Sequence, residues 1–203
     1  LAMAGANPID LHGDKYGRLD LDALAVAIKP NPHSESAALL CLENSFNGAG
    51  GTALAPDYIA AASEIAHACG AAVHLDGARI FNAAISLGVD VKEFTRHVDT
   101  VMFCISKGLS SPVGSLLAGP RDLILRARTL RYLHGGSMRQ AGVLAACGIV
   151  SLERMVDRLA EDHANARLIA EGLAEIEGIE VDLDRVQTNL IWFDIAGTGI
   201  AGD

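Results

Sequence analysis

The chain has 203 residues, of which 50% are hydrophobic and 20% are charged. This balance is typical of a globular protein of one domain, or of one domain and part of a second, and it excludes a disordered chain. The formal net charge of −9 argues against nucleic acid as a partner, because binding to phosphates requires a basic surface. No apolar run reaches the roughly 18–20 residues that a membrane span requires, so we expect no membrane partner.

The cysteines show no C-x-x-C spacing and lie in apolar or alanine-rich surroundings. They are Cys41, Cys69, Cys104 and Cys147. Such residues are typical of small buried hydrophobic side chains in a reducing compartment, so the expected location is the cytoplasm. The chain starts at Leu1 rather than at a methionine and trails off at Asp203 soon after an apolar strand. We therefore expect an internal fragment of a longer protein.

The first part of the chain alternates helices and strands, as in a parallel sheet with right-handed crossovers. The expected elements are an irregular stretch at 1–18, a helix over 19–28 that ends before Pro30, a strand over 37–42, a glycine-rich turn at 43–51 and a helix from Pro56 to Gly70. The glycine-rich turn is neither a P-loop nor a dinucleotide fingerprint. A plain turn or the rim of an active site is therefore favoured over a phosphate cradle.

Two apolar runs end abruptly in ionisable residues. The run over 71–75 stops at Asp76 and Arg79, and the run over 100–105 stops at Ser106 and Lys107. Ligands of an open α/β sheet lie just beyond the carboxyl ends of its strands, so an acid, a guanidinium and an amine are expected in one crevice. A lysine at such a position is costly unless it is paired or covalently used. This set suits Schiff-base chemistry, in which the amine condenses with a carbonyl.

Alternation places His74 on the same face of its strand as Asp76. It is either a ligand or a hydrogen-bonded core residue, and the core role is favoured.

The second part of the chain predicts more helices than strands. The expected elements are a helix over 80–87 stopped by Gly88, a turn or two of helix at 91–97, a strand over 114–118, a basic helix over 122–132, a small-residue helix over 138–150, a long amphipathic helix over 152–176, and strands at 179–181 and 190–195. Together they indicate an α/β protein with a mixed, mostly parallel sheet flanked by helices. We expect a large domain over 1–155 and the start of a smaller α/β domain over 156–203.

Three motifs carry a resemblance to a known family. They are HLDGARIFNA at 74–83, SKGLSSPVGS at 106–115 and GGSMRQAG at 135–142. In these motifs the chain resembles the low-specificity threonine aldolases. These are pyridoxal-phosphate (PLP) enzymes of fold type I, in the aspartate-aminotransferase superfamily and the beta-eliminating lyase family. The resemblance implies a PLP-transferase-like large domain. It also implies retro-aldol cleavage of threonine, allo-threonine or a related β-hydroxy-α-amino acid to glycine and an aldehyde, in a homo-oligomer, either a dimer or a tetramer.

The resemblance also implies roles for five residues. Lys107 forms the Schiff base with PLP, Asp76 pairs with the pyridine nitrogen, and Arg79 binds near the phenolic oxygen and the substrate carboxylate. Ser106 bonds the phosphate, and Arg139 reaches the phosphate in a neighbouring subunit. Structural alternatives remain for four of them: an ordinary loop lysine for Lys107, an N-cap for Asp76, an ion pair with Asp76 for Arg79, and a surface charge for Arg139.

This sequence departs from the family pattern at Phe46, where many members carry a histidine that faces the β-substituent of the substrate. Phe46 exchanges no proton, so the base is a water or a residue outside the fragment, and the preferred substrate is expected to be bulkier. Tyr132 also stands where a basic residue near the phosphate is common. Another PLP lyase or an aminotransferase, and a non-catalytic fragment of this fold, are the competing functions.

Overall fold

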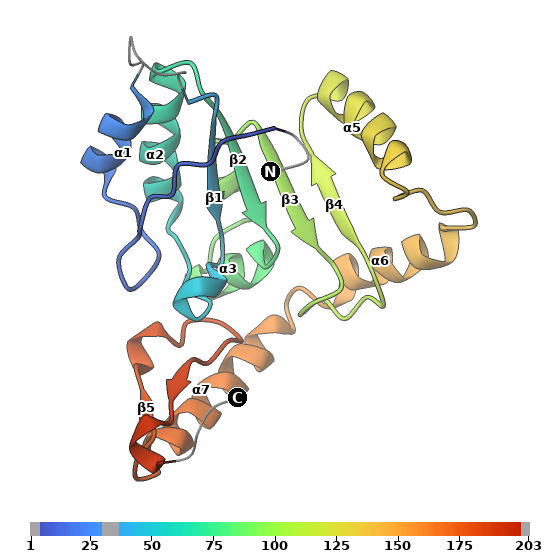
Figure 1. Cartoon of the computed structure of the whole chain (residues 1–203). Coiled ribbons are helices and arrows are strands. Elements are labelled where there is room, and N and C mark those ends of the chain that lie inside the picture. Colours follow the sequence, from blue (N-terminus) through green and yellow to red (C-terminus); the bar gives the residue numbers. More distant parts are fainter. Residues whose placement is uncertain (1–4, 30–36, 200–203) are drawn as a thin grey trace.

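The computed structural model describes residues 5–29 and 37–199. Its main sheet has four strands in the order β1-β2-β3-β4 (Figure 1). The bounds are β1 (Leu39–Glu43), β2 (Ala72–Gly77), β3 (Thr100–Cys104) and β4 (Ser115–Ala118). The first three strands run parallel, and β4 pairs antiparallel with β3. This confirms the expected mixed, mostly parallel sheet.

The core lies between the sheet and the helices of the first half of the chain. Helix α2 (Pro56–Ala68) packs against β1 and β2, and α1 (Leu21–Ile28) packs against α2. Leu40, Leu42, Val73 and Leu75 alternate along β1 and β2, point to this side and are buried with Ile59 and Ala62 of α2. Pro30, which we expected to end the first helix, lies outside the described residues.

The segments after β1 and β2 are short and place side chains at the carboxyl edge of the sheet. A 3-10 turn, η2 (Asn47–Ala49), follows β1, and α3 (Ile80–Leu87) follows β2. Gly88 adopts the left-handed conformation at φ +65° and ends α3, as predicted. A short helix, α4 (Lys92–Thr95), leads to β3.

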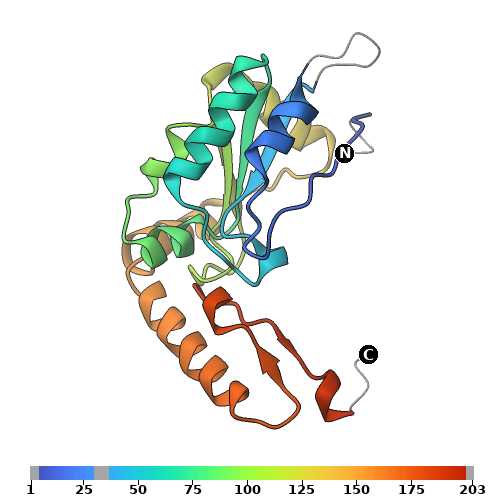
Figure 2. The same ribbon diagram turned by 90° about the vertical axis from the view of Figure 1, so that its left-hand side faces the viewer.

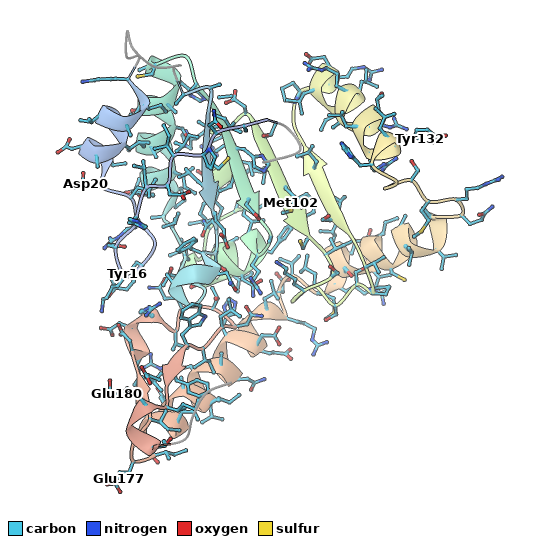
Figure 3. The ribbon with its side chains drawn as sticks, viewed as in Figure 1. Tyr16, Asp20, Met102, Tyr132, Glu177 and Glu180 are labelled. Carbon is cyan, nitrogen blue, oxygen red and sulfur yellow. The ribbon has the colours of Figure 1, made fainter. Side chains whose placement is uncertain are left out.

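After β4 one helix projects away from the sheet, and the next runs back toward it (Figure 1). Helix α5 (Arg121–Leu133) has no buried residue, and α6 (Gly142–Arg154) has only two. Figure 3 shows Tyr132 on the outer side of α5. The sequence predicted a helix from residue 138, but Gln140 has a positive φ of 52° and the helix begins after it.

The remaining elements form a second unit beyond the carboxyl edge of the sheet (Figure 2). This unit contains α7 (Leu159–Ala174), β5 (Glu180–Val181), η3 (Leu183–Arg185), β6 (Phe193–Asp194) and η4 (Ala196–Thr198). Strands β5 and β6 pair antiparallel.

The predicted continuous helix over 152–176 is wrong. The chain leaves the helix after Arg154 and turns before α7. Met155 and Val156 in this turn pack against a cluster of Ile105, Leu109 and Leu159 beside the sheet. Apolar residues at helical spacing therefore continue through the bend. The periodicity of apolar residues does not distinguish such a bend from a continuous helix. We propose that the boundary between the two domains lies at this bend, between residues 155 and 156.

Candidate functional site at the carboxyl edge of the sheet

The parallel pairing of β2 and β3 brings the two predicted strand ends to one edge. Asp76 lies opposite Met102 in the register, and Gly77 lies opposite Phe103. The chain continues from β3 to Ser106 and Lys107, which are both exposed. The carboxylate and the amine therefore follow neighbouring parallel strands to the same edge of the sheet.

Asp76 is half-buried, and its side chain is engaged locally. Its Oδ1 accepts a hydrogen bond of 3.0 Å from the backbone N–H of Ala78. The N-cap of α3 is Arg79 and has no side-chain cap, so the alternative role of Asp76 as a helix cap is not observed. Within residues 5–29 and 37–199, no arginine or lysine forms an ion pair with Asp76. The alternative role of Arg79, a structural ion pair with Asp76, is therefore not observed in the described part of the chain.

A second carboxylate lies beside Asp76. Glu43 is its register partner at the end of β1, and the Oε1 of Glu43 accepts a 2.9 Å hydrogen bond from the N–H of Asn47. Like charges directly opposite each other on neighbouring strands repel. A cation bound at this edge would relieve the repulsion, so the two carboxylates favour a positively charged ligand.

Arg79 is half-buried and extends toward the loop that follows β1. Its Nη1 is 3.5 Å from the Oδ1 of Asn47, at the limit of a hydrogen bond. In the described part of the chain the guanidinium has no carboxylate partner. Its planar fork therefore remains available to a carboxylate ligand.

The loop that carries Lys107 is anchored on both sides of the lysine. The N–H of Ser110 donates to the carbonyl of Lys107 at 2.9 Å, and the N–H of Ser111 donates to the carbonyl of Ile105 at 2.9 Å. Ile105 and Leu109 are buried. Ser106 Oγ donates to the carbonyl of Gly114 at 3.4 Å, a long bond that a phosphate could replace. The backbone is held while the Lys107 side chain faces solvent.

Phe46 lies in the loop after β1, and its ring packs against two glycines, Gly17 and Gly48. A Cβ added to Gly17 would lie 2.2 Å from the ring Cδ1 of Phe46, and one added to Gly48 would lie 2.9 Å from Cζ. Both positions therefore require glycine while the ring stays in place. The ring forms a half-buried apolar wall near the site.

The second unit holds this loop from outside the sheet. Arg185 Nε donates to the carbonyl of Ala49 at 3.0 Å, and Thr188 Oγ1 donates to that of Gly51 at 2.6 Å. Gln187 Oε1 accepts from the N–H of Ala53 at 2.9 Å. The sequence does not predict these three contacts, because partners 134 to 137 residues apart leave no local pattern.

Arg139 is exposed and lies between α5 and α6. This connection projects beyond β4, on the side away from β2 (Figure 1). The structure therefore does not bring Arg139 to the edge that carries Asp76 and Lys107 within one chain.

His74 is a half-buried member of the strand that carries Asp76. Its Nδ1 lies 2.7 Å from Thr100 Oγ1, as expected for a hydrogen-bonded residue. Burial lowers the pKa of His74, and the Asp76 carboxylate offsets part of this effect. The unfolded chain then binds the proton more readily. The stability that neutral His74 contributes is therefore full above the ordinary histidine pKa and is lost as the pH falls through the folded value.

When the pH is lowered from about 7.5 to about 5.5, the free energy of unfolding is expected to fall in the wild type. We expect a smaller fall in His74→Asn, because asparagine does not titrate in this range. Urea unfolding at the two pH values measures the difference, and His12→Asn, at an exposed position, is the control. An equal loss in His74→Asn and in the wild type would show that His74 does not titrate with folding.

Within the described residues, no group of three or more histidine, cysteine or carboxylate side chains is arranged to hold a metal ion. None of the described helices combines the length and the hydropathy that crossing a bilayer demands.

The chain is similar to known proteins over nearly its whole length. The beta-eliminating lyase family matches residues 1–196. Low-specificity L-threonine aldolase 1 of Arabidopsis thaliana is 41% identical over 196 residues, which is 95% of this chain and 55% of the relative. The low specificity L-threonine aldolase of Escherichia coli K12 is 46% identical over 186 residues, which is 91% of this chain and 54% of the relative. The chain thus spans about half the length of these relatives.

Solved structures share the fold at lower identity. Threonine aldolase of Leishmania major has a TM-score of 0.72 at 19% identity, over 89% of this chain and 54% of that chain. Cystalysin of Treponema denticola, a structure that contains a pyridoxal 5′-phosphate cofactor, has a TM-score of 0.67 at 17% identity, over 94% of this chain and 50% of that chain.

Proposed function

This chain belongs to the beta-eliminating lyase family, and on that premise we propose that it is part of a PLP-dependent aldolase. The reaction is cleavage of threonine, allo-threonine or a related β-hydroxy-α-amino acid to glycine and an aldehyde. The observation that carries the proposal is the shared edge of β2 and β3, where Asp76 and Lys107 leave parallel neighbouring strands. The identity of 41–46% to low-specificity threonine aldolases supports the substrate class.

The residues at this edge fit PLP by their chemistry. The exposed amine of Lys107 suits a covalent bond to the cofactor aldehyde. Asp76 has no cationic partner in the described part of the chain and lies beside a second carboxylate, so a protonated pyridine nitrogen suits it. Ser106 supplies a hydroxyl that suits the phosphate.

Each residue then has a defined task. Bound PLP supplies an electron sink for the pair of electrons released at the substrate Cα. Asp76 holds the proton on the ring nitrogen, which keeps that sink effective. Arg79 binds the substrate carboxylate through its planar guanidinium and so orients the Cα–Cβ bond. Lys107 would hold the cofactor covalently through its side-chain amine.

Phe46 contributes shape and no proton transfer. Its ring has no atom that takes up the β-hydroxyl proton, and it packs against Gly17 and Gly48. We propose that Phe46 lines the pocket for the substrate side chain. Replacement of a polar wall by an apolar one favours a bulkier and less polar β-substituent.

We propose a homo-oligomer, a dimer or a tetramer, in which Arg139 of one copy reaches the phosphate of another. The support is the number of exposed apolar side chains on β4, α5, α6 and the segment between the two helices. They are Leu116, Leu117, Leu123, Leu125, Leu130, Tyr132, Leu133, Met138, Val143, Ile149, Val150 and Leu152. Exposed apolar residues that gather on one part of a protein often mark an interaction surface.

We expect Leu130→Glu with Leu133→Glu to lower the molar mass in solution, because two carboxylates would be buried in the interface without partners. Light scattering after size exclusion measures the mass, and Val26→Glu on the exposed side of α1 is the control. A mass unaffected by the double substitution would remove α5 from the interface.

We also propose a cytoplasmic location. The support is that all four cysteines are free thiols, which is usual in a reducing compartment.

The proposed reaction is tested with the full-length protein. We expect it to show a yellow absorption band that shifts on addition of threonine and of glycine, and to release glycine and an aldehyde. Release of a keto acid instead would favour the aminotransferase alternative, for which Phe46 is the observation. A colourless protein would contradict both enzyme functions.

A further inference from the structure

A partly buried polar bridge joins the two units behind the lysine loop. Asn82 in α3 is 3% exposed. Its Nδ2 lies 3.1 Å from Nε2 of His163 in α7 and 3.2 Å from Oδ1 of Asn189. The three side chains come from segments that are 81 and 107 residues apart in sequence.

The hydrogen bonds of this bridge define which side chain donates, which accepts, and whether His163 is protonated. An amide nitrogen has two hydrogens and no acceptor site, so Asn82 donates one hydrogen to each partner. His163 must then accept at Nε2 and be neutral. Burial lowers the pKa of His163, which agrees with a neutral ring at pH 7, although the neighbouring Asp162 carboxylate offsets part of the effect.

Asn82 of this bridge lies beside the backbone of the lysine loop. A Cβ added to Gly108, the residue after Lys107, would lie 2.7 Å from Cδ2 of Leu159 and 3.4 Å from Oδ1 of Asn82. Leu159 is 1% exposed and also comes from α7. The backbone next to Lys107 therefore rests on one side chain of α3 and one of α7.

We propose that Asn82 is a positioning residue for Lys107 and that His163 and Asn189 fix its orientation. If the acceptor at His163 is lost, one hydrogen of a buried amide has no partner, and the side chain that supports Gly108 is free to rotate. The C-terminal unit thus sets the position of the lysine through Asn82. The inference rests on the proposed function only for the role of Lys107.

Hydrogen exchange of the whole chain without added PLP tests the inference through the amides of Ser110 and Ser111, which bond within the loop. His163→Gln keeps an acceptor near the position of Nε2, whereas His163→Phe keeps the volume of the ring and removes the acceptor. We expect exchange about tenfold faster in His163→Phe and in Asn82→Ala, and unchanged in His163→Gln. Asn165→Ala, at an exposed position of α7, is the matched control.

The two His163 variants decide the outcome even if Asn82→Ala fails to fold. Slow exchange in His163→Phe with fast exchange in His163→Gln would show that His163 acts by packing, and it would overturn the inference. Equal exchange rates in the two variants would also overturn it. Because the measurement needs no cofactor, its failure is distinct from that of the proposed function. A protein that binds PLP but shows equal rates would retain the function and lose the positioning role.

Discussion

Lys107→Ala is expected to remove the yellow chromophore of the full-length protein and to lower the rate of glycine release by about a thousandfold or more. The amine is the only covalent attachment that the proposal assigns to PLP. Its side chain is exposed and makes no hydrogen bond within the described residues, so its removal is expected to leave stability unchanged. The absorption spectrum, the rate and the urea unfolding midpoint together measure this result.

Lys92→Ala is the matched control, because Lys92 is also an exposed lysine at the sheet periphery, in α4. It is expected to behave as the wild type in all three measurements. A Lys107→Ala protein that keeps its colour and its rate would show that the amine is not used covalently.

Asp76→Asn is expected to lower the rate by about a hundredfold or more while the protein stays yellow. The amide has nearly the shape of the carboxylate and still accepts the hydrogen bond from Ala78. It carries no charge, so it no longer holds the proton on the cofactor ring. The loss is expected in kcat rather than in KM, because the missing interaction strengthens as charge develops.

A matched control exists for this substitution as well. Asp90 is exposed, and its Oδ1 accepts a local hydrogen bond of 2.8 Å from Lys92. Asp90→Asn removes the same charge from a similar turn away from the proposed site, and it is expected to keep the full rate. A rate that falls equally in both variants would trace the effect to net charge rather than to the site.

The local signals in the sequence predicted much of the fold. Gly88 ends α3, Pro56 begins α2, and the alternation along β2 separates buried Val73 and Leu75 from His74 and Asp76. These features depend on backbone conformation and on burial of one face of a strand. Residues close together in the sequence determine both. The convergence of β2 and β3 at one edge follows from their parallel order.

The missed features depend on distant contacts. Met155 and Val156 lie in a bend, but they pack against an apolar cluster as residues on the buried face of a helix would. The apolar pattern is therefore the same for the bend and for a helix. The bonds from Arg185, Gln187 and Thr188 to the loop after β1 join segments more than 130 residues apart. The roles assigned to Lys107, Asp76, Arg79, Ser106, Arg139 and Phe46 remain predictions.

The most direct test is to reduce the full-length protein with borohydride, digest it and locate the pyridoxyl group by mass spectrometry. We expect one modified peptide, with the adduct on Lys107 in the loop after β3. An adduct on Lys15, Lys29 or Lys92 instead, or no adduct in a protein that still releases glycine, would contradict it.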